Sequence, residues 1–438
     1  MACGRIVTFA TGLLVGPMAC GTPAYIVDGP ASCAVEDQNA YVLDVLEAYY
    51  LWNAHLPADV DPAAYSSPAS LVHDVRIGVD RWTRVADAAR TVTLQQDGKI
   101  VGLGFSTRRD LAGRVRIAHV VPGSPADVAG LRRGDVVVAV GDATAEELDA
   151  ADAWSGAYGP REPGVRVSMT VERAGGALVE IEIVKDWVSL VTVPYLRALP
   201  LGDGRSAAYM AFESFVEPAI AEIDAAVEAL AAQDPDVLVL DLRYNGGGLL
   251  DVAHHLANRI LGRRASGALF YRARHNADRR DLDFQRRFED AGPSLDPQVV
   301  FVLTSRSTAS AAELLAHGLA PHVEVVRIGD HTAGKPVGFH QFSFCDKKLQ
   351  PVTFRFENAL GRGGYYDGLT PHCPVLDDFE HERGDPDEAL LAEALAIARG
   401  EGCSAPSRPP AVPAFVPGPD DGAFDELLAT APTPSDQP

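Results

Sequence analysis

The chain has 438 residues, of which 47% are hydrophobic and 22% are charged, so its composition is that of an ordinary globular protein. At about 150 residues per domain, this length predicts about three folding units. The formal net charge is −22 at pH 7. A chain this acidic lacks the positive surface that a phosphate backbone requires, which excludes nucleic acid as its main partner.

Residues 1–20 are predicted to be an export signal. Arg5 supplies a positive start, and the apolar run after it is too short to cross a bilayer. Cys20 offers a lipoprotein cleavage and acylation point, although Pro17 stands where such sites have Leu. We expect an exported protein, periplasmic or an outer-membrane or cell-surface lipoprotein, with residues 21–32 as a tether. The alternative is a small buried N-terminal helix, and no membrane-spanning helix is expected anywhere in the chain.

Six cysteines are present, and four of them lie beyond the predicted signal and tether start. An oxidising compartment would favour pairing of these four, with three connectivities open. In the cytosol the same residues would be buried thiols. Because no two cysteines have zinc-finger spacing, we expect no structural metal. The four residues are Cys33, Cys345, Cys373 and Cys403.

Residues 33–98 are predicted to form a small helical N-terminal module. Between Tyr41 and Trp52, aromatic and aliphatic side chains recur at helical spacing. This pattern is typical of one buried helix face. We interpret it as ordinary core rather than as a ligand site.

Residues 99–187 consist of short β-branched runs separated by turns, and the whole succession resembles a PDZ domain. It includes Leu-Arg-Arg-Gly-Asp at 131–135. The resemblance implies that a glycine-rich loop presents backbone N–H groups to the C-terminal carboxylate of a peptide, which adds a strand to the sheet edge. The implied peptide-binding residues are Gly102, Leu103, Gly104 and Phe105.

Residues 188–403 alternate between apolar strands and amphipathic helices, which predicts an α/β core with a mixed sheet and flanking helices. The runs 237–242 and 299–304 are continuously apolar, as in a sheet that is covered on both faces. Residues 263–296 are rich in Arg, Asp and Gln, which indicates an exposed excursion. The segment 404–438 is Pro-rich and acidic without apolar periodicity, and we expect it to be disordered.

Three segments of this core carry candidate chemistry. Ser310 lies where a buried strand runs into a helix, at the positive end of the helix dipole. Lys335 follows in a Gly/Pro-containing loop, and a lysine desolvated in a cleft can act as a base. Residues 241–248 end in three glycines, whose N–H groups are accessible to an anion. Taken singly, the hydroxyl would be a helix cap, the lysine a solvated surface group and the glycines a tight turn.

Taken together and in this order, the three segments resemble the carboxyl-terminal processing (tail-specific) serine peptidases, in a divergent, exported or lipoprotein-like branch. That family places a PDZ domain before an α/β core. The resemblance implies Ser310 as the nucleophile and Lys335 as its general base. It also implies an oxyanion hole formed by the N–H groups of Gly247 and Ala311, with Gly246 nearby.

Three positions depart from the family pattern. Pro336 follows the lysine where a Gly is common. Gly246 stands where the processing peptidases commonly have Pro, and Phe339 stands where they often have Gln, four residues after the lysine. We therefore take Gln341, two residues further on, together with Glu313 as the candidates for orienting the lysine.

The sequence as a whole predicts a serine endopeptidase that binds the free C-terminal tails of protein or peptide substrates, with no cofactor or metal. One alternative is a catalytically inactive PDZ-bearing scaffold on the same fold, and another is a structural lipoprotein. A Ser-His-acid triad that uses His331 or His340 also stays open.

Overall fold

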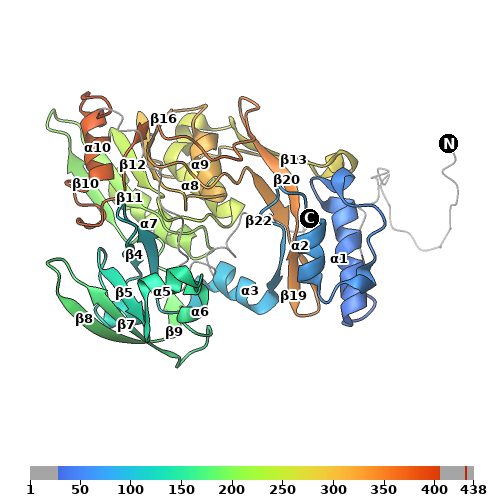
Figure 1. Ribbon diagram of the computed structural model, residues 1–438. Helices are drawn as coiled ribbons and strands as arrows, with labels where there is room; N and C mark the ends of the chain where they lie inside the picture. Colours follow the sequence, from blue (N-terminus) through green and yellow to red (C-terminus); the bar gives the residue numbers. More distant parts are fainter. Residues whose placement is uncertain (1–27, 405–429, 432–438) are drawn as a thin grey trace, which may run out of the picture.

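The computed structural model describes residues 28–404 and 430–431. The predicted export signal, Cys20, most of the tether and nearly all of the Pro-rich segment after residue 404 lie outside the described residues. Among those that are described, no helix is long and apolar enough to cross a membrane. The chain forms an N-terminal module, a smaller β unit and a larger α/β core, with helix α3 (Ala88–Asp97) lying between the first two in Figure 1.

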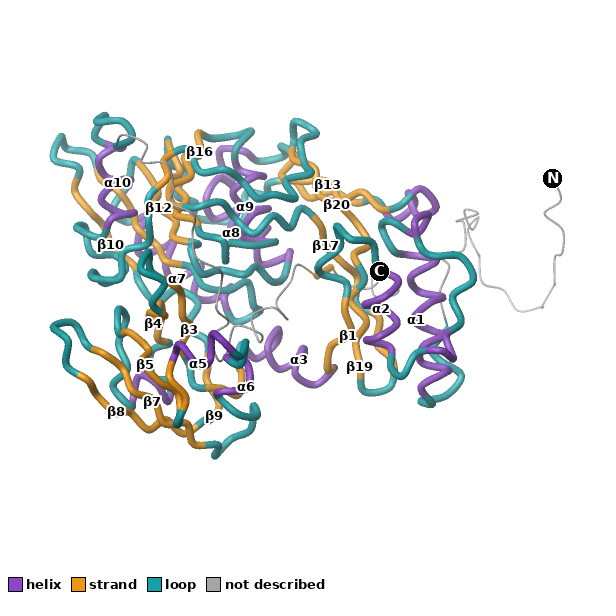
Figure 2. Tube along the Cα trace, in the orientation of Figure 1, coloured by secondary structure: helices purple, strands orange, loops and turns teal. Residues whose placement is uncertain are grey.

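The N-terminal module is built around α1 (Val35–Tyr49) and α2 (Pro68–Val75), which pack beside a three-stranded sheet (Figure 2). The aromatic stripe predicted as core is buried except for Trp52, which is partly buried, and the Tyr41 ring lies 5.4 Å from that of Phe344. The sheet takes two strands from late in the sequence, so the module is completed by the core rather than by residues 33–98 alone. Its order is β1 (Arg84–Asp87), β19 (Lys347–Gln350) and β18 (Phe342–Phe344).

The smaller β unit has the architecture that the PDZ resemblance implies. Its strand order is β3-β4-β5-β7-β8, so β3 (Phe105–Arg109) is an edge strand. The strands that enter and leave the unit, β2 (Lys99–Gly102) and β9 (Asp186–Ser189), pair with each other as a separate antiparallel two-stranded ribbon. The other elements are β4 (Val115–Val120), α4 (Pro125–Val128), β5 (Val136–Val140), β6 (Ala143–Thr144), α5 (Ala145–Ala150), α6 (Trp154–Ala157), β7 (Arg166–Glu172) and β8 (Leu178–Val184).

The α/β core is a six-stranded sheet with helices on both faces. Its order is β10-β11-β12-β15-β16-β21, with β10 antiparallel to an otherwise parallel sheet. Alternate residues of each central strand face opposite layers: Leu238 and Leu240 contact the cluster of α7, α8 and α9, whereas Val237 and Val239 contact that of α10. This double coverage explains the continuous apolar runs.

The candidate site lies at the carboxyl ends of the central strands, and the bounds of the core elements are as follows. They are β10 (Leu196–Pro200), β11 (Ser206–Ala211), α7 (Ala219–Ala231), β12 (Val237–Asp241), α8 (Leu250–Ala265), β15 (Val299–Thr304), α9 (Ala311–Leu319), β16 (Glu324–Gly329), β21 (Cys373–Pro374) and α10 (Ala389–Ala398).

A second sheet corrects the expectation for residues 263–296. This segment is not an exposed excursion: it forms β13 (Leu269–His275), a 3-10 turn at Ala277–Leu282 and β14 (Phe284–Arg287). Phe270, Tyr271 and Phe288 are buried against the main core, while Asp278, Arg280 and Asp281 between them are exposed. The sheet continues through β20 (Val352–Asn358) and β17 (Val337–His340) to β22 (Thr430–Ala431).

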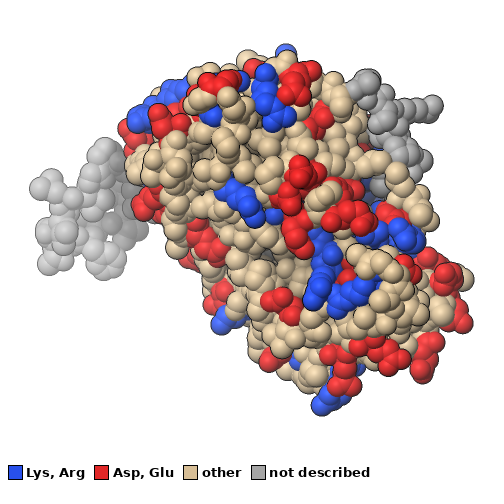
Figure 3. Space-filling model, turned by 90° about the vertical axis from the view of Figure 1, so that its left-hand side faces the viewer, with Lys and Arg blue, Asp and Glu red and all other residues tan. Residues whose placement is uncertain are grey.

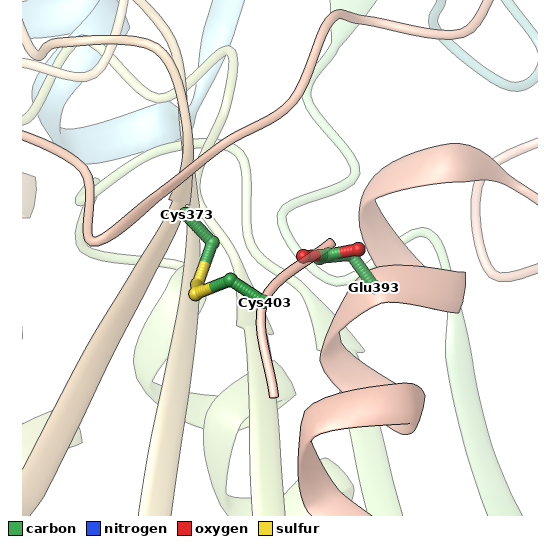
Figure 4. A group of neighbouring side chains, drawn as sticks. All are labelled: Cys373, Glu393 and Cys403. Atoms are coloured by element: carbon green, nitrogen blue, oxygen red, sulfur yellow. A yellow bond between two sulfur atoms is a disulfide. The ribbon is translucent and has the colours of Figure 1, made fainter. Parts of the chain in front are cut away.

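Two disulfides select one of the three connectivities left open by the sequence. Cys33–Cys345 joins the N-terminal module to the turn between β18 and β19. Cys373–Cys403 joins β21 to the segment after α10, beside Glu393 (Figure 4). The two sulfurs and a carboxylate oxygen of Glu393 lie within 4.8 Å of one another, but the sulfurs are bonded together and the carboxylate accepts hydrogen bonds from Ser404. These three residues are therefore a disulfide and a hydrogen-bonded carboxylate rather than a metal site.

Candidate active site

Ser310 occupies the sharp turn between β15 and α9. Its φ and ψ are 58° and −114°, a conformation that a residue with a Cβ rarely adopts. The side chain is fully buried, and the residue opens the helix, where the macrodipole favours negative charge. Its main-chain N–H donates to Glu313 Oε2 at 2.8 Å, which holds the strained turn in place.

Glu313 joins the serine turn to the lysine loop. Its carboxylate is buried and also accepts from Thr332 Oγ1, from the N–H of Gly334 at 2.8 Å and from the N–H of Lys335 at 2.8 Å. Burial raises the pKa of Glu313, and the four donors oppose that shift by stabilising the charged form. The carboxylate therefore holds both catalytic candidates by their main chains. The sequence contains a signal for this arrangement, because Ser310 and Glu313 have the three-residue spacing of a capping box.

Lys335 lies in the loop between β16 and β17, and its side chain is fully buried. The preceding Gly334 has φ of 84°, and a Cβ there would come within 2.2 Å of Tyr366 O, so only glycine fits. The ammonium nitrogen of Lys335 lies 4.7 Å from the centre of the Phe339 ring. The lysine side chain is therefore inside the core and is not the solvated surface group that the loop, taken singly, would suggest.

The glycine turn after β12 packs directly on the serine. A Cβ on Gly247 would lie 2.8 Å from Ser310 Cβ, and the N–H of Ala309 donates to Asn245 O at 3.0 Å. The N–H of Gly247, predicted to serve the oxyanion hole, donates to Asn245 Oδ1 at 2.8 Å in this structure. The N–H of Ala311 belongs to the first turn of α9, whose N–H groups have no intrahelical acceptor.

The remaining candidates have other partners. The amide of Gln341 donates to Gln95 Oε1 at 3.2 Å, which connects it to α3 (Ala88–Asp97). His331 lies beside Asp330, with 3.4 Å between Nδ1 and Oδ1. His340 Nε2 lies 3.0 Å from the Nε2 of His275 on β13. These contacts lend no support to a Ser-His-acid triad.

A buried cluster of ion pairs, which the sequence did not suggest, lies next to the glycine turn. Arg243 is fully buried and pairs with Asp241 at 3.0 Å and with Glu388 at 2.7 Å. Arg383 also pairs with Asp241, at 3.2 Å. From the PDZ unit, Arg133 donates to the hydroxyl of Tyr244 at 2.8 Å, one residue before Asn245. The PDZ unit is thus bonded to the turn that faces the serine.

A cavity of about 240 Å³ lies between the PDZ unit and the serine turn. Phe105 and Ser106 of edge strand β3 line one side, and Gly246, Ser307 and Ala309 line the other. Within the described part of the chain, β3 pairs with β4 alone. A peptide added to the edge of β3 would therefore enter this cavity, next to the turn that precedes Ser310.

The predicted carboxylate loop has the required close packing. Gly104 has φ of 87°, and a Cβ there would lie 2.1 Å from Ser124 Cβ, so a side chain cannot be accommodated. Its carbonyl accepts from the N–H of Val121, and the carbonyl of Leu103 accepts from Ala126. Phe105 is buried in the PDZ core. The loop is held rigidly at the start of the edge strand.

The fold and these motifs are a PDZ-like unit joined to an α/β core that carries the candidate serine and lysine. The model of peptidase family S41 matches residues 206–375, the peptidase S41 N-terminal domain matches 37–84, and a PDZ domain matches 116–154. These matches bear out the sequence resemblance to the S41 peptidases, and the predicted core, PDZ domain and helical N-terminal module are confirmed.

Curated relatives include carboxyl-terminal-processing peptidase 2, chloroplastic, of Arabidopsis thaliana, which is 28% identical over 68% of this chain and 58% of its own length. The carboxyl-terminal-processing protease of Picosynechococcus sp. is 26% identical over 68% of this chain and 71% of its own length. The match thus spans little more than half of the first relative.

Solved structures show the same fold. A putative S41 protease from Bacteroides fragilis aligns with a TM-score of 0.68 and 23% identity, covering 83% of this chain and 97% of that one. The photosystem II D1 C-terminal processing protease aligns with a TM-score of 0.53 and 22% identity, covering 83% and 99%.

Proposed function

We propose that this protein is a serine endopeptidase that binds C-terminal tails through its PDZ domain and hydrolyses peptide bonds with a Ser310–Lys335 dyad. The observation that carries the proposal is the shared acceptor: Glu313 Oε2 accepts from the N–H groups of both residues. Two candidates from loops 25 positions apart in the sequence are held on one atom. Such support is what a preorganised nucleophile and base require.

In the proposed reaction, the neutral amine of Lys335 takes the proton of Ser310 Oγ as that oxygen attacks the scissile carbonyl carbon. The C–N bond then breaks, and Lys335 returns the proton to the leaving amine. Water, deprotonated by Lys335, attacks the carbonyl carbon of the resulting ester. The bond from that carbon to Ser310 Oγ then breaks, and Lys335 returns the proton to Oγ as the carboxylic acid product leaves. The negative oxygen of each tetrahedral intermediate accepts from the N–H of Ala311 at the helix N-terminus.

The glycine turn supplies the second oxyanion donor in this proposal. Gly246 lines the cavity beside the serine turn. Gly247 becomes available when its N–H leaves Asn245 Oδ1, its acceptor in this structure. That bond is also the specific observation that favours the second candidate function, a peptide-binding scaffold without turnover.

The proposed test uses a fluorogenic peptide that has a free carboxylate and an apolar last residue, and its C-terminally amidated twin. The wild-type protein should hydrolyse the free acid faster than the amide, and Ser310→Ala and Lys335→Ala should each abolish hydrolysis while the far-UV circular dichroism is unchanged. Binding of the free acid without hydrolysis by the wild type would instead favour the scaffold.

Export is part of the proposal because two disulfides join Cys33 to Cys345 and Cys373 to Cys403, and such bonds persist in oxidising compartments. Acylation of Cys20 stays a prediction. Labelling of cells with a radiolabelled fatty acid, with Cys20→Ser as the control, tests the anchor: absence of label on the wild type would exclude it.

A further inference from the structure

The strand that follows the lysine loop carries the end of the chain on its outer edge. β17 begins two residues after Lys335 and pairs antiparallel with β20 on one side. On its other side it pairs in parallel with β22, where Phe339 lies opposite Thr430 and the next residues of the two strands are also paired. Among the described residues, β22 is therefore the only strand on the outer edge of β17.

The two elements beside β22 start from the loops of the candidate active site. β22 also contacts α8, which begins just after the glycine turn that packs on Ser310. Its other neighbour, β17, begins just after Lys335. Phe339, which lies opposite Thr430, is also the residue whose ring centre lies 4.7 Å from Lys335 Nζ. A chain on this edge thus lies beside the residue that contacts the proposed general base.

The direction of the N–H groups of β17 shows which of them face the outer edge. Successive N–H groups of a strand point to opposite sides. The N–H of His340 donates to Thr353 Oγ1 at 3.0 Å, on the β20 side, so the N–H of Phe339 points toward β22. Strand pairing uses main-chain atoms, so an extended chain of almost any sequence can accept from this group.

The pairing between β17 and β22 is short. It joins two residues of each strand. Each hydrogen bond of such a pairing contributes only about 1 kcal/mol net in water. β22 is joined to the core through residues 405–429, so it is not one arm of a hairpin with β17. Another extended chain can therefore replace β22 while the rest of the sheet stays in place.

A partner of this edge is recognised by its main chain rather than by its charge. Neither β17 nor β22 contains Asp, Glu, Lys or Arg. The face of the molecule in Figure 3 differs, because acidic and basic side chains are intermixed on it. The chemistry of the β17 edge thus fits an extended polypeptide with few requirements on its side chains.

We propose that the outer edge of β17 is a docking site for the extended main chain of a polypeptide, and that the protein's own C-terminal segment at Thr430–Ala431 occupies it until a substrate chain takes its place. The consequence for turnover rests on the proposed function, because a substrate paired with β17 runs beside Lys335. The docking itself does not depend on hydrolysis. The end of the chain is then an intramolecular competitor of the substrate.

Hydrogen exchange of the full-length Ser310→Ala protein tests the docking, since this variant cannot cleave its own end under the proposed mechanism. Thr430→Pro with Ala431→Pro removes both N–H groups of β22 and prevents it from pairing as a strand. The Phe339 amide should then exchange about tenfold faster, while the amides of β12 stay protected. Thr430→Val with Ala431→Val is the matched control, because β-branched residues favour a strand and should keep this exchange slow.

The second measurement adds the free-acid peptide of the hydrolysis test to the Ser310→Ala protein that carries the two prolines. Bound peptide should slow the exchange of the Phe339 amide again, and at a lower peptide concentration than in the protein with its native end. With Ser310 intact, the two prolines should raise kcat/KM for this peptide about threefold, through a lower KM and not a higher kcat, because the competitor is gone.

Equal exchange of the Phe339 amide in the native and the two-proline proteins would show that β22 does not cover the edge, and overturns the proposal. Faster exchange that the peptide does not slow would show that a substrate does not dock on β17, and also overturns it. Protection by the peptide in Ser310→Ala, together with no hydrolysis by the wild type, leaves the docking site standing and removes the peptidase.

Discussion

The N–H groups of Ser310 and Lys335 donate to the same oxygen, Oε2 of Glu313, each at 2.8 Å. The two nitrogens therefore lie no farther apart than twice that distance. One buried carboxylate thus fixes the main chains on both sides of the proposed proton transfer, and its other oxygen accepts from Thr332 and Gly334. Three of the four donors are main-chain N–H groups. Substitutions of the donor residues' side chains would therefore leave these three hydrogen bonds to the carboxylate in place.

Glu313→Gln should lower kcat/KM by about a hundredfold or more. The glutamine amide has one oxygen instead of two, so its NH2 group faces main-chain donors that had an acceptor, and each buried N–H left without one costs about 1–3 kcal/mol. Steady-state kinetics and the thermal unfolding midpoint measure the two effects. Glu324→Gln, at an exposed position on β16, is the matched control. Wild-type kcat/KM in Glu313→Gln would remove the positioning role.

Arg133→Met should release the PDZ unit from the core. The Arg133 side chain is 5% exposed, pairs with Asp377 at 3.0 Å and donates to Asp378 O at 2.7 Å. Removing one member of such a buried cluster costs on the order of 3 kcal/mol. Hydrogen exchange should accelerate in residues 377–381, while the PDZ core stays protected.

The adjacent Arg132→Met is the control for this experiment, because Arg132 is exposed. Unchanged exchange in both variants would show that Arg133 does not hold the interface.

Acid should destabilise the protein between pH 6.5 and about 4. Burial between the PDZ unit and the core lowers the pKa of His119 to about 4, and burial with the neighbouring His340 lowers that of His275 to about 3. Both pKa values lie below the unfolded value, so the unfolded chain binds protons first, and the stability present above pH 6.5 is lost as the pH falls.

The expected loss is about 2 kcal/mol per histidine from pH 7 to pH 5, since one pKa unit corresponds to about 1.4 kcal/mol. Thermal midpoints at the two pH values measure it. His119→Gln should narrow the difference between them, and the same acid sensitivity in His119→Gln as in the wild type would contradict the assignment.

Replacing Cys33 and Cys345 with Ser should destabilise the chain by roughly 2–5 kcal/mol, because the disulfide closes a loop with a sequence separation of 312. The cross-link also joins the N-terminal module to the core strands that complete it. Replacing Cys373 and Cys403, whose separation is 30, should cost less. Urea unfolding curves of the two double variants rank the effects, and the reverse order would contradict the loop argument.

The sequence predicts the elements that have local signals. The strand at 299–304 has the predicted bounds, and Ser310 and Lys335 lie in turns that short motifs identify. The contacts that organise the site are long-range: nothing near Asp241 indicates that Arg383, more than a hundred residues later, pairs with it. In 263–296 the many charged residues obscured the buried aromatic side chains between them, so the segment was wrongly predicted to be exposed.

Digestion of β-casein by the purified protein, with Ser310→Ala and Lys335→Ala beside it, tests the central claim most directly. The mass spectrum should show fragments with the wild type and none with either variant, while all three proteins have the same thermal midpoint within about 2 °C. Fragments that persist in Ser310→Ala or in Lys335→Ala would show that the dyad does not carry the reaction.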